Sequence, residues 1–240
     1  MMAQKKKKKV NKPTKSSSSK FVFWIIGLIA VAIIGFIFLA NNQKSDDNAG
    51  KEEIDYANQP FLGEESAPVS IVEFGDYKCP NCKNFADNVV PLIVKEFVDT
   101  GKAKFYYFHY PFINVDSKRT AKFSEAVYSE LGNDKFWEFH ELIYDKQPED
   151  TRYEKIDVFT EEFLTETLKE IASEDEVKKV AAYFDTKAPE DAWKSDEDLA
   201  GELGVSGTPT IFVNGKRFDG KTMDDLNELV EEASKGEGNE

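Results

Sequence analysis

Cysteine and histidine are scarce in this 240-residue chain, which has two of each. A disulfide framework uses several cysteines far apart in the sequence, whereas only two residues separate Cys79 from Cys82. A bridge between them would close a very short loop and stabilise the fold only slightly. A zinc site needs four ligands, and only the isolated His109 and His140 could supplement the pair. A structural bridge and a zinc site are therefore the weaker explanations of these cysteines.

Basic residues are also scarce beyond residue 40. The first 40 residues hold eight lysines and no acid, so the remainder carries 23 basic and 45 acidic residues, a net charge of −22. A domain this acidic repels nucleic acid, which excludes DNA and RNA binding. The 40% hydrophobic content, with 19 phenylalanines, suits one packed domain of ordinary size.

Charge is absent from one long stretch, the 20 residues Phe21–Ala40. That length matches a membrane-spanning helix. Because lysines precede the stretch and acids follow it, the positive-inside rule predicts a cytoplasmic N-terminus and an exported domain. A cleaved signal peptide is the alternative, although its hydrophobic region would be only about 7–15 residues long. No cysteine follows the stretch, which excludes a lipoprotein anchor.

These observations divide the chain into five segments. We predict a cytoplasmic basic segment (1–20), a transmembrane anchor (21–40), an extracytoplasmic linker (41–57), a folded domain (58–235) and a frayed tail (236–240). Both explanations of the hydrophobic stretch place the folded domain outside the cytoplasm.

The folded domain begins with a predicted strand–helix–strand unit. Val69–Phe74 and Lys104–Tyr110 have strand patterns, and a helical pattern runs from Cys82 to about Asp99 with a kink predicted at Pro91. Such a unit requires two parallel strands with the helix packed across them.

A helical block and a hairpin complete the domain. Residues 117–203 contain no good strand pattern; we predict helices at about 118–131, 134–145, 160–172, 174–185 and 190–203. Asn214–Gly215 lies between two strand-like runs and predicts a hairpin. Thr222 is the expected N-cap of a final helix that ends near Ser234.

The spacing of the two cysteines favours redox chemistry. Three residues along a helix make nearly one turn, so a disulfide can close between Cys79 and Cys82. Free N–H groups and the helix dipole favour a thiolate at the helix N-terminus, where Pro80 costs no hydrogen bond. The thiolate is the reactive form. We therefore expect Cys79 to be the nucleophile and Cys82 a more buried resolving thiol.

The motif order resembles the DsbA branch of the thioredoxin superfamily. Cys79-Pro80-Asn81-Cys82 between a strand and a helix, a helical insertion, and Gly207-Thr208-Pro209 before a hairpin carry the resemblance, and Phe136–His140 is similar to a family pattern. Over about residues 58–235 the chain most resembles the membrane-anchored DsbA-like oxidoreductases of Gram-positive bacteria, the BdbD type. The resemblance implies an α/β thioredoxin fold, a central mixed sheet flanked by helices, with an all-helical subdomain inserted at about 117–203.

The resemblance also implies roles for the loop before the hairpin. Thr208–Pro209 would be the superfamily's cis-proline beside the CxxC turn, where the backbone of Thr208 pairs with a bound peptide and Pro209 keeps metal from the thiols. Pro80, Asn81 and Thr208 are thus the expected substrate-binding residues. An ordinary trans proline that opens a strand is the alternative.

Glu73 lies six residues before Cys79, where thioredoxin relatives carry a buried acid. In that position its pKa would be raised and it could relay a proton to or from Cys82. Strand alternation alone does not fix which face Glu73 occupies, so a solvent-facing edge position stays open.

The resemblance implies a dithiol oxidase that forms disulfides in unfolded secreted proteins with free thiols. It would need no metal and no cofactor besides the Cys79–Cys82 disulfide, and a quinone-linked integral membrane protein would reoxidise it. The DsbA type has histidine before the second cysteine; here Asn81 predicts a smaller lowering of the Cys79 pKa and a weaker oxidant. A reductase or isomerase of the same fold and a non-catalytic thioredoxin-like binding module are the alternatives.

Other polar residues receive structural interpretations. His109 and His140 are expected to be packing residues in a strand and on an aromatic helix face. The acid pairs Glu161–Glu162 and Glu190–Asp191 match no recognised calcium loop and are expected on solvated helix faces.

Overall fold

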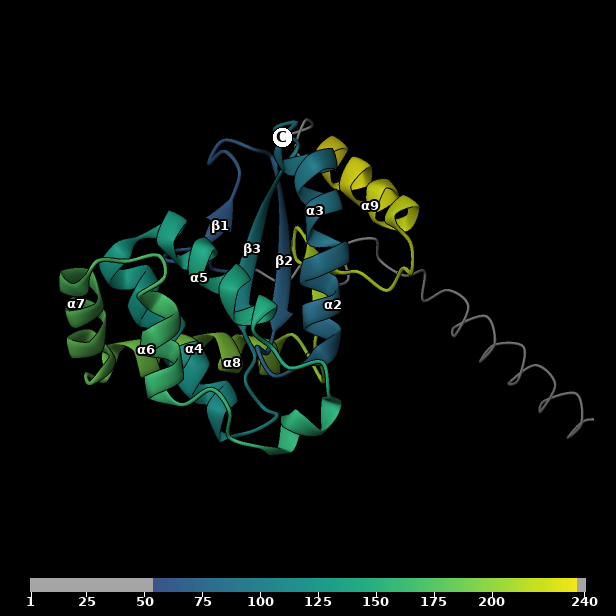
Figure 1. The fold of residues 1–240 in the computed structure, drawn as a ribbon. Helices are drawn as coiled ribbons and strands as arrows, with labels where there is room; N and C mark the ends of the chain where they lie inside the picture. The colour runs from purple at the N-terminus through teal and green to yellow at the C-terminus, as the bar shows by residue number, and fades with distance from the viewer. Residues whose placement is uncertain (1–53, 237–240) are drawn as a thin grey trace, which may run out of the picture. The chain divides into compact units, whose positions relative to one another are not determined.

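The computed structural model describes residues 54–236 (Figure 1). The predicted basic segment, the anchor Phe21–Ala40 and most of the linker lie outside these residues. None of the helices within 54–236 has the length and hydrophobicity needed to cross a bilayer.

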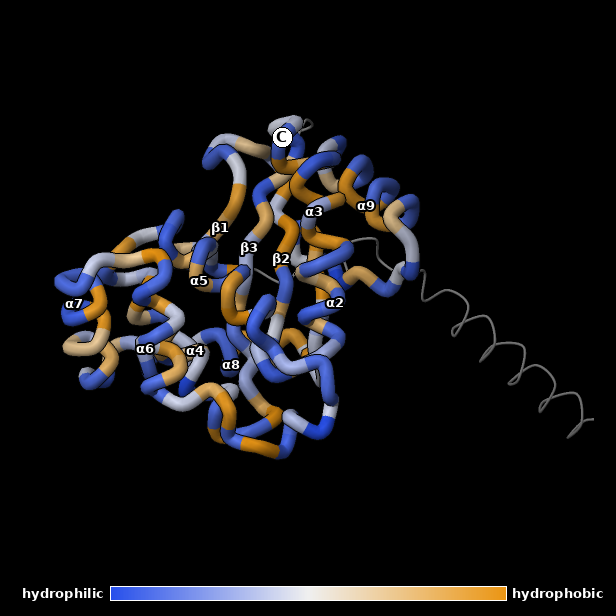
Figure 2. The backbone as a smooth tube through the Cα atoms, viewed as in Figure 1, coloured by the Kyte–Doolittle hydropathy of each residue, from blue (hydrophilic) through white to orange (hydrophobic). Residues whose placement is uncertain are grey.

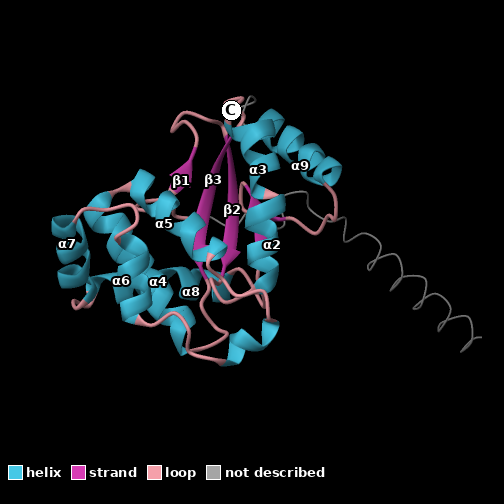
Figure 3. Ribbon diagram, viewed as in Figure 1, coloured by secondary structure: helices cyan, strands magenta, loops and turns pink. Residues whose placement is uncertain are grey.

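A mixed five-stranded sheet forms the centre of the domain (Figure 3). Its strands, in the spatial order β1-β3-β2-β4-β5, are β1 (Phe61–Leu62), β3 (Ala103–His109), β2 (Val69–Gly75), β4 (Thr210–Val213) and β5 (Lys216–Arg217). β2 and β3 are parallel, and the other pairs are antiparallel. Every residue of β2 is buried. The mixed sheet flanked by helices confirms the predicted fold class.

A helical crossover joins β2 to β3. It comprises α2 (Pro80–Asn88), α3 (Val90–Ile93) and the π-helix η1 (Val94–Val98). The helix begins at Pro80, with Cys79 at its N-terminus as expected, although the hydrophobic pattern started only at Cys82. The predicted continuity was wrong: the helix breaks at Val89 rather than bending at Pro91, since a proline disfavours helical geometry at the preceding residues.

The helical insertion follows β3. It consists of α4 (Val115–Leu131), α5 (Asn133–Asp145), the 3₁₀ helix η2 (Thr151–Lys155), α6 (Glu161–Leu168), α7 (Glu174–Phe184) and α8 (Ala188–Glu202). Side chains of Asn114, Thr160 and Ser173 cap three of these helices. η2 was not predicted.

The chain ends in the predicted hairpin and helix. Asn214 and Gly215 have φ of 45° and 77°, the left-handed geometry that a two-residue hairpin turn requires. α9 (Met223–Gly236) begins after Thr222, whose hydroxyl accepts a hydrogen bond from the Asp225 amide at 3.1 Å. Figure 2 shows α9 alternating between hydrophobic and hydrophilic residues along its length, as an amphipathic helix does.

Two hydrophobic clusters cover the two faces of the sheet. The larger includes Val69 and Ile71 of β2 with both cysteines and residues of α5 and α9. The smaller includes Val72 and Phe74 of the same strand and Ala200 of α8. Because successive strand residues point to opposite faces, β2 is covered on both sides. The Cys79–Cys82 motif therefore follows a strand that is buried along its whole length.

Candidate active site

The two cysteines lie where β2 gives way to α2. Cys79 is the N-cap residue of α2, with extended backbone, and Pro80 occupies the first turn. Cys79 is 6% exposed and Cys82 is fully buried, and both thiols are free. The prediction that Cys82 is the more buried thiol is confirmed.

Hydrogen bonds lower the pKa of Cys79 from its ordinary value of 9.0 to about 6. The bond with Cys82 contributes most; burial opposes it, and the Thr208 side chain and the backbone amides of Cys82 and Asn81 add to the lowering. Those amides are available because the first N–H groups of a helix have no partner within it. The nucleophile of DsbA has a pKa of about 3.5. The lowering is thus smaller here, in the direction predicted from Asn81.

The rate at which reduced Cys79 is alkylated should follow the fraction of Cys79 that is present as thiolate. We expect the rate of reaction with iodoacetamide to rise through a midpoint near the pKa of about 6. The reduced protein should also gain stability between that pKa and 9.0. In this range the folded thiol has released a proton that the unfolded thiol still holds, so the gain is lost as the pH falls through the folded pKa. Mass spectrometry of the alkylated peptide measures the midpoint, and one near 9 would contradict this site geometry.

Glu73 is buried beside the cysteines, with 1% of its surface exposed. It lies on the same face of β2 as Val69 and Ile71, the face of the cluster that holds Cys79 and Cys82. Neither carboxyl oxygen has a hydrogen-bond partner within residues 54–236. Burial raises the pKa of Glu73, and the charge of Cys79 adds to the shift. The solvent-facing alternative was therefore wrong.

Burial also raises the pKa of Cys82 well above its ordinary value. Its hydrogen bond with Cys79 and the negative charge of Glu73 act in the same direction. The two thiols of one motif consequently have opposite tendencies: Cys79 is held as a thiolate and Cys82 as a thiol.

The loop before β4 reaches the turn of residues 76–79, between β2 and α2, which we call the redox turn. The Thr208–Pro209 peptide bond is cis, as the resemblance implied. The Thr208 carbonyl oxygen lies 3.3 Å from Cys79 Sγ. This loop therefore lies against Cys79.

Pro80 and Asn81 lie at the surface in the first turn of α2, with Pro80 partly exposed and Asn81 exposed. Both follow Cys79, which is itself nearly buried. Their contact with substrate, like that of Thr208, stays a prediction.

Five residues around the redox turn were missed in the sequence. Asp76, Lys78, Asp116, Gln147 and Tyr153 are all buried and hydrogen-bonded to one another or to the backbone of the turn. Only the bond from the Lys78 amide to the Asp76 carboxylate, 2.8 Å long, has a local signal, since Asp two residues before an amide is the spacing of an Asx turn.

The two histidines lie in the core, as predicted. His140 Nδ1 is 3.0 Å from the Tyr77 hydroxyl, and burial lowers the pKa of His109 and His140 to about 3, so both are neutral. Within residues 54–236 there is no group of three or more His, Cys, Asp or Glu side chains placed to hold a metal ion.

Comparison with known proteins gives the family. A family profile described as thioredoxin matches residues 55–232. The probable disulfide bond formation protein D of Bacillus anthracis is 36% identical over 203 residues, which cover 84% of this chain and 90% of that protein. The disulfide bond formation protein D of Bacillus subtilis is also 36% identical over 203 residues, with 81% and 84% covered.

Solved structures agree with this result. Oxidised BdbD from Bacillus subtilis superimposes with a TM-score of 0.67 at 34% identity, covering 75% of this chain and 95% of that one. The thiol-disulfide exchange protein α-DsbA2 from Wolbachia pipientis gives 0.60 at 26% identity, with 73% and 87% covered. The chain therefore belongs to the thioredoxin family, among the DsbA-like disulfide bond formation proteins, and is a protein-disulfide oxidoreductase.

Proposed function

We propose that Cys79 and Cys82 are the redox pair with which this oxidoreductase oxidises protein thiols. The difference in acidity between the two thiols carries the proposal: the pKa of Cys79 is lowered to about 6, whereas that of Cys82 is raised. A stabilised thiolate favours the reduced form, which makes the corresponding disulfide a stronger oxidant. It also makes Cys79 a good leaving group from a mixed disulfide.

The reaction transfers two electrons from substrate to enzyme. A substrate thiolate attacks Cys79 Sγ of the disulfide, the Cys79–Cys82 bond breaks, and Cys82 leaves with the electron pair. The second substrate thiolate then attacks the substrate sulfur of the mixed disulfide and releases Cys79 as a thiolate. The substrate gains a disulfide, and the enzyme is left as the dithiol that the structure describes.

Glu73 is the proposed proton donor to Cys82. With its raised pKa, the carboxyl group is positioned to be protonated when the Cys82 thiolate leaves. The reverse transfer would activate Cys82 when the enzyme is reoxidised. Among the causes that raise the pKa of Cys82, the charge of Glu73 is the one that comes from a carboxyl group.

Glu73→Gln should slow the enzyme while stabilising its fold. We expect formation of the mixed disulfide to slow about tenfold or more, since proton transfer by a positioned side chain contributes about 10²–10⁴-fold. The free energy of unfolding at pH 7 should rise. In the wild type, folding buries a carboxyl group that has no partner and must take up a proton, whereas glutamine carries no charge in either state. Stopped-flow tryptophan fluorescence follows the first effect and denaturant titration the second. Wild-type kinetics at pH 7 would show that Glu73 has no part in proton transfer.

We place the redox domain outside the cytoplasm, attached by the anchor Phe21–Ala40. The lysines before this uncharged stretch and the acids after it support the orientation. Since the chain has only two cysteines, it has no internal relay for the electrons it receives. A membrane protein linked to quinones is the proposed acceptor, and unfolded secreted proteins are the proposed substrates.

Oxidative refolding tests this function. The oxidised full-length chain is mixed with a reduced, unfolded protein whose activity requires disulfides, without any other oxidant. Stoichiometric recovery of disulfides in the substrate, matched by appearance of the Cys79 and Cys82 thiols, is the expected result. Reduction of a native substrate disulfide by the dithiol form, with no oxidation by the disulfide form, would instead identify a reductase.

A further inference from the structure

A segment of the helical insertion wraps around the redox turn. Residues 147–159, which we call the strap, run from the end of α5 through η2 to the start of α6. Gln147 and Tyr153 in the strap are 3% and 4% exposed, so neither side chain is placed to meet a substrate. Their polar groups point instead at the backbone of the redox turn.

The strap donates to three consecutive carbonyl groups. Gln147 Nε2 donates to the Tyr77 oxygen at 2.7 Å and to the Cys79 oxygen at 3.2 Å. The Tyr153 hydroxyl donates to the carbonyl oxygen between them, that of Lys78. These are the carbonyls of the nucleophile and of the two residues before it.

Asp76, at the start of the same turn, accepts hydrogen bonds from its amides. Its carboxylate accepts from the Lys78 amide at 2.8 Å, and its carbonyl oxygen accepts from the Cys79 amide at 2.9 Å. The peptide units on both sides of Lys78 are therefore held at their N–H and C=O ends together. Because a peptide unit is planar, fixing both ends fixes its orientation, and with it the point at which α2 begins.

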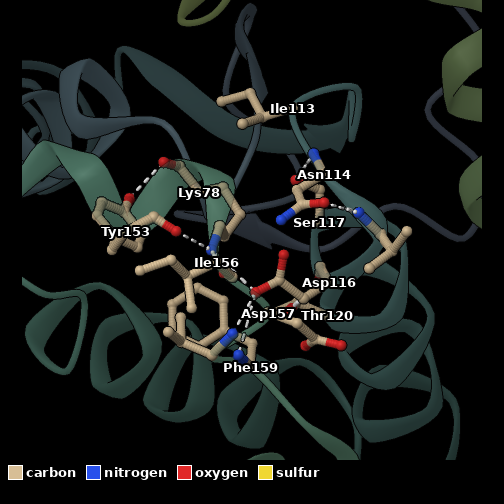
Figure 4. A network of polar contacts seen from close by, with 12 residues as sticks. Lys78, Ile113, Asn114, Asp116, Ser117, Thr120, Tyr153, Ile156, Asp157 and Phe159 are labelled. Atoms are coloured by element: carbon tan, nitrogen blue, oxygen red, sulfur yellow. Dashed lines mark hydrogen bonds and ion pairs between the residues drawn. The ribbon is translucent and has the colours of Figure 1, made fainter.

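The side chain of Lys78 anchors the strap (Figure 4). Its ammonium group is fully buried and donates to the carbonyl oxygens of Tyr153 at 2.8 Å and Ile156 at 2.7 Å and to Asp116 Oδ2 at 2.9 Å. Asp116 Oδ2 also accepts from the amides of Val158 and Phe159 at 2.9 Å and 3.1 Å. These bonds fix residues 153–159, the second half of the strap, in addition to the bonds that its side chains make to the redox turn.

We propose that Gln147 and Tyr153 are positioning residues of the redox reaction, which hold residues 77–79 so that the first amides of α2 face Cys79 Sγ. The proposal rests on Cys79 being the nucleophile. A purely structural role would change only the stability of the fold. The proposed role also changes the acidity of the Cys79 thiol when these bonds are lost.

The variants Gln147→Leu and Tyr153→Phe, singly and combined, test the proposal in the full-length reduced protein. Both replace a neutral group with a neutral group, so any change at Cys79 reports geometry and not charge. Thiolate absorbance near 240 nm as a function of pH gives the Cys79 pKa, which is about 6 in the wild type. We expect it to rise by about one unit in the double variant, since a unit corresponds to roughly 1.4 kcal/mol, the size of one hydrogen bond.

The equilibrium constant for thiol–disulfide exchange with glutathione should change together with the Cys79 pKa. A rise of one unit weakens the stabilisation of the dithiol form about fivefold at pH 7, so the enzyme becomes a weaker oxidant by that factor. Tyr128→Phe is the matched control: it also deletes a tyrosine hydroxyl that donates to a distant carbonyl, that of Gln59 at 3.2 Å, but touches no atom of the turn. The control should leave both quantities unchanged.

Folded variants with a wild-type pKa and a wild-type glutathione equilibrium would overturn the proposal. Tyr153→Phe removes a single oxygen atom. If the double variant does not fold, the result for Tyr153→Phe is interpreted on its own. A Cys79→Ser variant is assayed beside them. If it is inactive while the strap variants have an unshifted pKa, only the positioning role fails; if it is fully active, the proposed redox centre fails.

Discussion

Cys79→Ser is expected to reduce disulfide formation in a reduced substrate to the rate of the buffer alone. A serine hydroxyl forms neither the disulfide nor the mixed disulfide, and the proposed route passes through Cys79 Sγ at every step. Circular dichroism of the variant checks that the fold persists, as it should for the exchange of one sulfur for one oxygen. Activity equal to that of the wild type would refute the assignment.

Cys82→Ser should have a different result, and the contrast makes the test specific. Cys79 keeps its thiolate, but the thiol that would attack and release a mixed disulfide at Cys79 is absent. We expect a mixed disulfide between Cys79 and substrate or glutathione to accumulate, visible on non-reducing gels and by mass spectrometry. Equal behaviour of the two serine variants would contradict the division of roles that the opposite pKa shifts of the thiols support.

Asp116→Ala is expected to destabilise the protein by about 3–5 kcal/mol, the usual cost of breaking a buried ion pair from one side. Both side chains of the Lys78–Asp116 pair have no exposed surface. Removing Asp116 leaves the Lys78 ammonium group without its counter-charge and the amides of Val158 and Phe159 without their acceptor. Denaturant titration measures the loss.

Two comparisons make that number interpretable. Asp157→Ala breaks a neighbouring ion pair with Arg119 at 2.6 Å, but Asp157 is 43% exposed, so the cost should stay within about 1 kcal/mol. The double exchange Lys78→Met/Asp116→Leu removes both charges and should recover only the part of the loss that is due to the unpaired ammonium group, because the amides of Val158 and Phe159 still lack their acceptor. Equal effects of Asp116→Ala and Asp157→Ala would contradict the importance we assign to burial.

Features with a local cause could be predicted from the sequence. The hairpin at Asn214–Gly215, the strand Val69–Phe74 and the cap at Thr222 depend on backbone preferences of a few adjacent residues, and the structure has all three, with the strand one residue longer, to Gly75. The continuity of the helix after Cys79 was predicted wrongly because the hydrophobic spacing runs on without a gap, while the helix itself is interrupted at Val89, two residues before Pro91, and resumes as α3 and η1.

Features with a tertiary cause could not be predicted. β2 is buried on both faces, so alternation gave no polar side on which to place Glu73, and only the pairing with β3 and β4 fixes its face. Lysine is by default a surface residue, and nothing near Lys78 in the sequence indicates that Asp116 and the strap would enclose it. Gln147 and Tyr153 follow no hydrophobic period and acquire their role only when the insertion folds back on the turn.

The reduction potential of the Cys79–Cys82 pair tests the central claim most directly. The full-length chain is equilibrated in glutathione buffers of graded ratio, the thiols are trapped with acid and alkylated, and the oxidised fraction is measured. We predict a value on the oxidising side, nearer to the roughly −120 mV of DsbA than to the roughly −270 mV of thioredoxin. A value near the thioredoxin end would contradict the account and identify the protein as a reductase of the same fold.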